Sequence, residues 1–300
     1  MIKTANMKIL FITSARGIDY QGDCLFHGLV SLGHEVTDTK YLWYLLEPMT
    51  AEQKAAQYGR GFTLASTLPD RSASVDRDGI ADRIAAHEFD LVVYGSIARC
   101  ADWTGHVSAH YGKGEVAVVD GEDDARIREP FDRLGAYFKR ELTEASRALP
   151  ISFAMPADKF LADGTRTPKE RMLAELIPGR RETYRFTDET EYYRAYAKSR
   201  FGLTMKKAGW DCLRHYEIIG SCCLPLFKGM EACPKSIMAE WPWTMQMEAN
   251  RLYAEAERGE TDGKWPERYA ELLSRFYIYA KSHLTTEALA RRFIEAMCWR

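Results

Sequence analysis

The sequence lacks any long apolar run. Its first apolar stretch, KILFIT at residues 8–13, is too short for the core of a signal peptide. No other stretch approaches the roughly 18 apolar residues that a transmembrane helix needs. These absences predict a soluble, cytoplasmic protein with no membrane span.

An excess of charge of one sign is also lacking. The chain has 41 Lys and Arg residues against 43 Asp and Glu residues, a formal net charge of -2. This balance provides no protein-wide field that would attract nucleic acid or an anionic membrane. Two basic segments, residues 126–140 and 178–185, still offer local contacts to phosphates. Nucleic acid therefore stays possible as a partner, but the net charge does not indicate it.

Several cysteine and nucleotide motifs are missing. The seven cysteines are odd in number and show no CxxC spacing, so we expect reduced, intracellular thiols rather than a disulfide framework or a zinc site. His106 and His110 are spaced to share a helix face, but no third metal ligand accompanies them. The absence of GxGxxG and P-loop motifs disfavours an NAD-dependent dehydrogenase and a P-loop nucleotidase.

The first half of the chain alternates apolar strands with amphipathic helices. With 300 residues, 46% of them apolar, the chain is long enough for two domains. The pattern predicts strands at 8–13, 34–39, 90–94 and 115–119, and helices at 23–32 and 79–87. Repeated βαβ units predict a mostly parallel, doubly wound sheet.

The second half opens with a proline-rich, charged segment at 150–181, which we interpret as the crossing between domains. A helix capped by Thr187 or Asp188 is expected to follow. The remaining predicted elements are strands at 200–204 and 222–227 and helices at 245–259, 269–283 and 285–297. This order predicts a second, smaller α/β domain with a helical tail.

The most charged stretch, KKAGWDCLRHYE, lies between the two strands of the second half. Lys206, Lys207 and Gly209 are expected in a loop at the carboxyl edge of the sheet, and a helix is predicted to begin at Trp210 or Asp211. The free N–H groups of a helix start and a flexible glycine suit an anion. A helix dipole contributes only about 0.3 to 2 kcal/mol, so cationic side chains must supply the remaining attraction.

Arg214 and Glu217 complete this pattern on one face of the predicted helix. Arginine suits a bidentate phosphate contact, and a glutamate can accept hydrogen bonds from vicinal hydroxyls such as those of ribose. Together with the two lysines, they predict a nucleoside diphosphate site. The alternative is that Asp211, Arg214 and Glu217 form an exposed, ion-paired helix face that contributes about 0.2 to 0.5 kcal/mol per pair.

The order R-x-x-E on a helix, a small-residue turn and an apolar strand with proline resembles the donor-binding segment of GT-B glycosyltransferases. The closest resemblance is to a bacterial and phage-borne group related to CgeB-like spore-maturation proteins. The segments that resemble this group are VVDGEDDARI (118–127), YFKREL (137–142), PISFAMP (150–156) and EYYRAYAKSRFGLTMKKAGWDCLRHYEI (191–218). The similarity covers about residues 88–245, and residues 192–227 are its specific part.

The resemblance implies a GT-B-like α/β fold, with two Rossmann-like domains facing a cleft. We place an acceptor-side domain at 1–158 and a nucleotide-sugar donor domain with a helical tail at 159–300. The donor is a co-substrate, and no other cofactor and no metal is implied. The expected donor-binding residues are Lys206, Lys207, Gly209, Trp210, Asp211, Arg214, His215 and Glu217. Glu217 matches the second glutamate of the E-x7-E motif of retaining members, but Gly209 occupies the first position, so the stereochemistry stays open.

Glycosyl transfer builds negative charge on the departing phosphate. Lys207, Arg214 and the helix start are expected to stabilise that charge, since catalysis uses interactions that strengthen in the transition state. An inverting enzyme also needs a base, for which Asp19 and Asp23 in the first loop are candidates; both suit capping equally well. Asp120, at the start of DGEDD, is expected to line the cleft and, with Asp19 and Lys207, to be catalytic; the other acidic residues of this motif are expected to be structural or to contact the basic residues of FKREL.

The sequence thus predicts a metal-independent hexosyl- or pentosyltransferase. Its acceptor hydroxyl belongs to a glycan, a protein, a metabolite or a modified DNA base. One alternative is a non-catalytic nucleotide-sugar-binding module of the same fold, which the missing first glutamate favours. Another is a hydrolase that uses the DGEDD carboxylates with a divalent metal ion.

Overall fold

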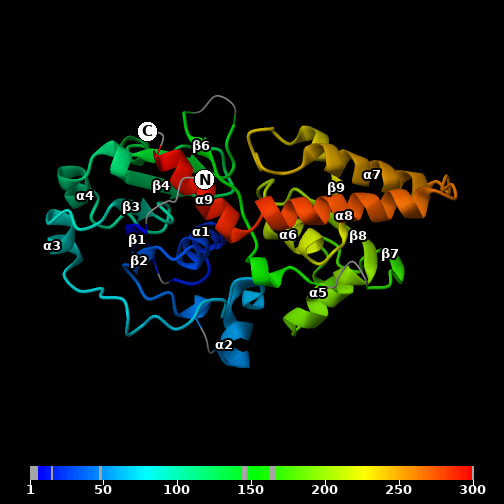
Figure 1. Ribbon diagram of the computed structural model, residues 1–300, viewed down its shortest axis with the longest axis horizontal. Helices are drawn as coiled ribbons and strands as arrows, with labels where there is room; N and C mark the ends of the chain where they lie inside the picture. The colour runs from blue at the N-terminus through cyan, green and yellow to red at the C-terminus, as the bar shows by residue number, and fades with distance from the viewer. Residues whose placement is uncertain (1–5, 15, 47–48, 144–146, 163–166, 299–300) are drawn as a thin grey trace.

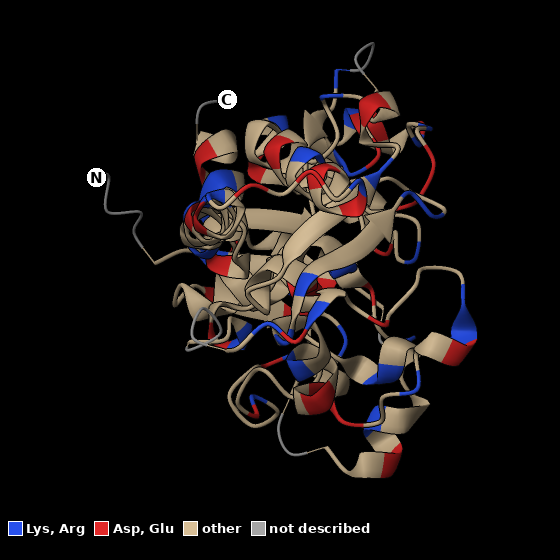
Figure 2. Cartoon of the chain, turned by 90° about the vertical axis from the view of Figure 1, so that its right-hand side faces the viewer, with Lys and Arg blue, Asp and Glu red and all other residues tan. Residues whose placement is uncertain are grey.

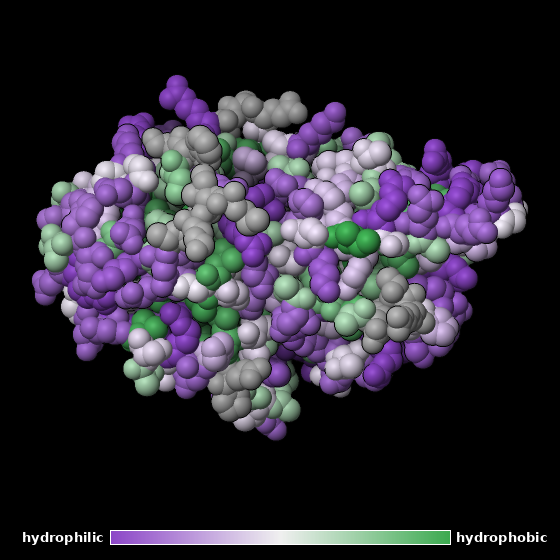
Figure 3. All heavy atoms as spheres, in the orientation of Figure 1, coloured by the Kyte–Doolittle hydropathy of each residue, from purple (hydrophilic) through white to green (hydrophobic). Residues whose placement is uncertain are grey.

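The computed structural model describes residues 6–14, 16–46, 49–143, 147–162 and 167–298. Its helices and strands form two α/β units that lie side by side (Figure 1). Charged residues of both signs are interspersed on the side drawn in Figure 2, and hydrophilic residues dominate the face in Figure 3. Within the described ranges, no helix combines the length and apolarity needed to cross a bilayer.

The first unit contains a six-stranded parallel sheet with the order β2-β1-β3-β4-β5-β6. The strands are β1 (Lys8–Ile12), β2 (Glu35–Asp38), β3 (Leu91–Tyr94), β4 (Val116–Asp120), β5 (Ala136–Lys139) and β6 (Leu149–Pro150), and the helices are α1 (Tyr20–Ser31), α2 (Ala51–Ala56), α3 (Ile80–Ala85) and α4 (Thr104–His110). Strand β2 lies on one side of β1 and strand β3 lies on the other, so the direction in which successive strands are added to the sheet reverses between β1 and β3. In parallel α/β sheets, the carboxyl edge at such a switch point is where ligands bind.

Both faces of this sheet are buried. Ile9 and Phe11 of β1 face a core that includes α1, whereas Leu10 and Ile12 face a second core under α3 and α4. Burial on both faces explains why the strand reads as a continuous apolar run rather than as an alternating one.

The second unit has a three-stranded parallel sheet with the order β7-β8-β9. Its strands are β7 (Arg171–Leu173), β8 (Ser199–Met205) and β9 (Leu224–Lys228), and its helices are α5 (Glu189–Ala197), α6 (Leu213–Gly220), α7 (Trp243–Glu257) and α8 (Trp265–His283). The α/β class, the two Rossmann-like parallel sheets and the C-terminal helices are therefore confirmed.

The last helix, α9 (Thr286–Cys298), leaves the second unit and packs on α1 of the first (Figure 1). The two helix backbones touch at Gly28, where an added Cβ would lie 2.0 Å from the carbonyl oxygen of Thr286. Only glycine fits at this crossing, because any side chain would collide with backbone.

Some predicted boundaries are wrong. Helix α1 begins at Tyr20 rather than Asp23 because the Asp19 carboxylate accepts a hydrogen bond from the Gly22 N–H at 3.2 Å and caps the helix. Helix α6 begins later than predicted, at Leu213.

The segment interpreted as a crossing contains strand β7, although its residues 163–166 lie outside the described part. Strands β5 and β6 were not predicted either. The division between residues 158 and 159 stays a prediction.

Candidate functional site

The segment between β8 and α6 packs directly on the first unit. The backbone N–H groups of Trp210 and Asp211 donate to the Glu141 carboxylate at 2.9 and 3.0 Å. At Gly209, an added Cβ would lie 2.6 Å from Glu141 Oε1 and 2.9 Å from Arg140 Nη1. In this structure, the requirement for glycine at position 209 therefore comes from the close packing of the two units and not from a ligand.

Asp211 holds this junction together. Its buried carboxylate accepts hydrogen bonds from the Phe153 N–H at 2.7 Å and from the Tyr216 hydroxyl at 3.1 Å, and its carbonyl accepts one from Arg140 at 2.5 Å. Burial raises the pKa of Asp211, and the charge of Arg140 acts in the opposite direction. Its oxygens are engaged inside the protein, and a contact with a donor stays a prediction.

His215 is packed in the core of the second unit. Its Nδ1 lies 2.8 Å from Thr204 Oγ1, its Nε2 lies 2.9 Å from the carbonyl oxygen of Trp210, and its ring stacks on Phe227. Burial lowers the pKa of His215 to about 4, so the imidazole is neutral near pH 7. These contacts give the ring a structural role, and a role in donor binding stays a prediction.

Lys206 and Lys207 are exposed in the loop after β8. The Lys206 ammonium lies 5.0 Å from the centre of the Trp210 ring, and the Lys207 N–H donates to the carbonyl oxygen of Gly209 at 3.0 Å. The predicted catalytic role of Lys207 is not tested by this geometry.

Arg214, in the first turn of α6, is a partly buried cation without a matching anion. Its Nε and Nη1 are buried and make no hydrogen bond within the described part of the chain, and its guanidinium carbon lies 5.3 Å from the centre of the Tyr184 ring. The buried hydroxyls of Tyr184 and Tyr196 also make no hydrogen bond there. Buried donors without an acceptor are costly, so this position suits an anion that the structure does not contain.

Glu217 lies one helical turn further along and connects both units. Its carboxylate accepts hydrogen bonds from the Thr63 hydroxyl of the first unit at 2.5 Å and from the Tyr192 hydroxyl of α5 at 2.6 Å. Burial raises the pKa of Glu217, while these hydrogen bonds act to lower it. Because Asp211 and Glu217 are both buried, the alternative of an exposed, ion-paired helix face is wrong.

Asp19 lies at the carboxyl edge of the first sheet, where it was expected. Its carboxylate caps α1 and pairs with Arg99, whose Nε lies 3.1 Å away. Asp23 lies deeper: it is 2% exposed, it accepts a hydrogen bond from the Tyr44 hydroxyl at 3.0 Å, and burial raises its pKa. Asp19 therefore contacts the cavity described next, whereas Asp23 is enclosed.

A cavity of about 170 Å³ opens beside Asp19. Its lining residues come from the start of α1 and the loops after β3, β4, β5 and β6, and they are Asp19, Tyr20, Gln21, Arg99, Gly121, Glu122, Asp123, Arg140 and Phe153. We call it the edge cavity. It is smaller than the roughly 300 to 1,000 Å³ of typical ligand pockets, so it does not have room for a whole nucleotide sugar.

The expectation for Asp120 requires a correction. Asp120 does not line the edge cavity; it is fully buried, its Oδ1 lies 3.0 Å from the Lys139 ammonium, and it accepts a hydrogen bond from the Tyr137 hydroxyl at 2.7 Å. The next residues of DGEDD, Gly121 to Asp123, line the cavity instead. Strand β5 places the buried Lys139 beside Asp120, and this ion pair stabilises the Asp120 carboxylate in the protein interior.

Metal ligands do not cluster here. No group of three or more His, Cys, Asp or Glu residues that would hold a metal ion occurs in the described ranges. Within DGEDD, Asp123 pairs with Arg140 and Asp124 pairs with Arg126. This arrangement does not favour the hydrolase alternative.

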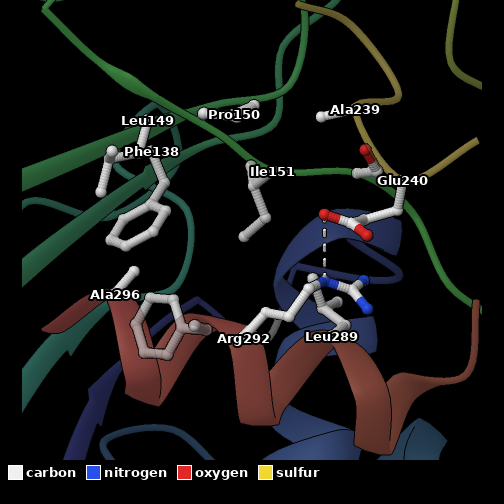
Figure 4. A pocket seen from close by; sticks show the side chains of 11 residues that line it. Phe138, Leu149, Pro150, Ile151, Ala239, Glu240, Leu289, Arg292 and Ala296 are labelled. Carbon is white, nitrogen blue, oxygen red and sulfur yellow. Dashed lines mark ion pairs between the residues drawn. The ribbon is translucent and has the colours of Figure 1, made fainter. Parts of the chain in front are cut away.

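A second cavity, of about 180 Å³, lies between α9, the sheet edge at β5 and β6, and the 239–240 segment (Figure 4). Phe138, Ile151 and Leu289 give it a mostly apolar lining. At its rim, Arg292 Nε lies 3.7 Å from Glu240 Oε1. It is separate from the residues predicted for the donor.

Sequence reasoning missed several residues that the fold brings to the site. Thr63 was not considered, although it contacts Glu217, and Gln21 and Arg99 line the edge cavity without belonging to any motif; Phe153 also lines it and lies in the PISFAMP segment, where no role was assigned to it. Arg140 lies in the YFKREL segment, which was noted for its resemblance to the family, but no role was assigned to Arg140 itself. These residues converge from distant parts of the chain, so spacing gave no signal.

No protein-family model and no curated protein matches the chain. Solved structures share a weak likeness in fold with it. They include an alpha-glucosyltransferase in complex with UDP and a 13-mer DNA containing an A:G mismatch, at 10% identity over 97% of this chain and 100% of that chain, with a TM-score of 0.49. The glycosyltransferase AviGT4, involved in avilamycin A biosynthesis, shares 11% identity over 97% of both chains, with a TM-score of 0.45.

HepE of Anabaena, in complex with UDP and glucose, shares 11% identity over 98% of this chain and 100% of that chain, with a TM-score of 0.45. Glycosyltransferases, the class that the sequence resembles, thus occur among these structures. The CgeB-like subgroup stays a prediction.

Proposed function

We propose that this protein is a metal-independent GT-B-like glycosyltransferase that moves a sugar from a nucleoside-diphosphate donor to an acceptor hydroxyl. The observation that supports this most directly is the Arg214 guanidinium, whose Nε and Nη1 are buried without an acceptor one helical turn from Glu217. An anion between the units would satisfy these donors.

In this proposal, Arg214 contacts the diphosphate, and its attraction grows as negative charge develops on the leaving group. Lys206 and Lys207, exposed on the preceding loop, supply further positive charge when the donor is bound. Glu217 holds the ribose hydroxyls in place of the Thr63 hydroxyl that it now binds. Asp19, at the facing edge, is the proposed base for the acceptor hydroxyl.

A thermal-shift titration with UDP, GDP and ADP tests the donor site. At least one diphosphate is expected to raise the melting temperature of the wild type, since a ligand that binds only the folded state stabilises it. Arg214→Met, which keeps the length of the side chain and removes its charge, should abolish the shift. The matched control is Arg251→Met on α7, an exposed arginine that should leave the shift unchanged.

This titration, together with an assay of sugar transfer and donor hydrolysis with and without EDTA, decides between the proposed function and its alternatives. If no diphosphate stabilises the wild type, or if both variants respond like it, the donor site is wrong. Diphosphate binding without sugar transfer or donor hydrolysis would instead identify the non-catalytic binding module. Turnover that EDTA abolishes would contradict the metal-independent mechanism.

A further inference from the structure

The edge cavity is lined by two arginines: Arg140 is fully engaged inside the protein, whereas the side chain of Arg99 is 38% exposed and is engaged through two of its nitrogens. Arg99 pairs with Asp19 and donates to the Ile18 carbonyl at 2.9 Å. Arg140 is 1% exposed; its Nε donates to the Gly121 carbonyl at 2.9 Å, and its other nitrogens donate to acidic side chains and to a backbone carbonyl. The Arg140 guanidinium is therefore not available to capture an anionic ligand, and Arg99 offers only its Nη2, since its other nitrogens are engaged by Asp19 and Ile18.

The other polar groups that remain available in this cavity are acceptors. Gln21 is 1% exposed and uses its Nε2 to donate to the Ser152 carbonyl at 3.1 Å, but its Oε1 has no partner among the described residues. Glu122, also in the lining, makes no side-chain hydrogen bond or ion pair within those ranges. Since an unsatisfied buried acceptor costs free energy, the cavity suits a ligand that brings hydrogen-bond donors.

The cavity also has an aromatic wall. The Phe153 ring lies 4.6 Å from the guanidinium carbon of Arg140, and Tyr20 meets this ring edge-on at 6.2 Å. An aromatic ring beside hydrogen-bond acceptors matches the surface of a saccharide, which has C–H groups on its faces and hydroxyls around its edge. The volume of about 170 Å³ corresponds to one ring rather than to an oligomer.

We propose that the edge cavity binds a single saccharide ring through its hydroxyl or amino groups, and that this ring is part of the acceptor. The second half of this inference rests on the proposed function. Three carboxylates, those of Asp19, Glu122 and Asp123, line the cavity together with two arginines; Asp19 and Asp123 pair with these arginines, which leaves the negative charge of Glu122 unpaired. The lining therefore repels a phosphorylated acceptor, which distinguishes a glycan or a small sugar from a nucleic acid backbone.

The test is a ligand-observed NMR titration of the full chain with glucose, glucosamine and glucose 6-phosphate. Glucose and glucosamine should bind, and glucose 6-phosphate should bind more weakly than glucose. Glu122→Gln should lower the affinity for glucosamine about tenfold, because a charge-assisted hydrogen bond becomes a neutral one. Glu129→Gln, the same change at a side chain that is 73% exposed and outside the cavity, should leave the affinity unchanged.

A second variant tests ligand binding in the edge cavity without changing Glu122. Gln21→Met removes the unsatisfied oxygen at similar side-chain length, and it should weaken glucose and glucosamine alike. Thermal unfolding of each variant checks that it is folded before it is titrated.

The inference is overturned if neither neutral nor amino sugar binds, if glucose 6-phosphate binds most tightly, or if Glu122→Gln and Glu129→Gln behave alike. Diphosphate stabilisation, measured on the same samples, separates this result from the proposed function. A diphosphate shift without sugar binding overturns the saccharide cavity and leaves the donor site standing. Sugar binding without any diphosphate shift supports the cavity but overturns its role as an acceptor site.

Discussion

Replacing Thr63 by valine removes one hydroxyl from the contact between the two units. Thr63 is fully buried, and its Oγ1 donates to Glu217 Oε1 at 2.5 Å. Its φ of +78° is unusual for a β-branched residue, but valine has the same branching and keeps that strain. The substitution therefore removes the donor to a buried carboxylate together with the contact between the same oxygen and the Tyr193 hydroxyl at 2.7 Å, which should lower the free energy of unfolding by about 2 to 3 kcal/mol.

Urea unfolding of the purified chain measures this change. The matched control is Thr67→Val in the same loop, where the hydroxyl donates to the carbonyl oxygen of Leu64 at 2.6 Å. That bond joins two neutral groups within one loop, so its loss should cost only about 0.5 to 1.5 kcal/mol. The expected difference between the two variants is thus about 0.5 to 2.5 kcal/mol.

A double-mutant cycle with Glu217→Gln assigns the difference to this pair. If the Thr63 hydroxyl acts through the Glu217 carboxylate, the two changes should be coupled by about 1 kcal/mol or more. The reasoning is refuted if Thr63→Val costs no more than Thr67→Val, or if its cost is the same with and without Glu217.

Three further measurements test other parts of the structure. Gly28→Ala should lower the free energy of unfolding by about 1 to 3 kcal/mol in a denaturant titration, because the new methyl group meets the backbone of α9. The control is Gly105→Ala, where the added methyl group meets open space and should not destabilise the protein. Equal losses in the two variants would contradict the α1–α9 crossing. Lys139→Met should cost about 3 kcal/mol in the same assay by removing the nearer of the two cations beside the buried Asp120, whose other oxygen stays 3.4 Å from Arg128 Nε; a near-neutral result would refute the pairing with Lys139. Because the pKa of Glu217 is raised in the folded state, its contribution to stability is present below its unfolded pKa and is lost as the pH rises through its folded pKa. Over that pH window, the free energy of unfolding should therefore fall less in Glu217→Gln than in the wild type. Identical slopes of unfolding free energy against pH would contradict the burial of Glu217.

The fold class was predictable because periodicity reports burial directly. The run at β1 is apolar on both faces, and apolar residues recur every three to four positions in the helices of the second half. Strand β5 was missed because it is four residues long and ends in Lys139, a charge that reads as exposed in the sequence but is neutralised in the interior by Asp120. Patterns of hydropathy cannot reveal a buried ion pair whose members lie on different strands.

The candidate site was predictable only where it lies on one helix. Spacing alone places Arg214 and Glu217 on the same face of α6, and the structure has them there. The reason for Gly209 was different from the expected one, since this residue touches Glu141 of the first unit. Contacts between units depend on the tertiary arrangement, and short-range spacing carries no information about them.

The return of α9 to α1 has a consequence for synthesis of the chain on the ribosome. The side of α1 that α9 covers, which includes His27 and Gly28, has its partner in residues 286–298. A nascent chain that already contains the whole six-stranded sheet still exposes this surface until the last helix emerges. The N-terminal half should therefore aggregate when expressed alone, and its native state should form only after translation has passed α9.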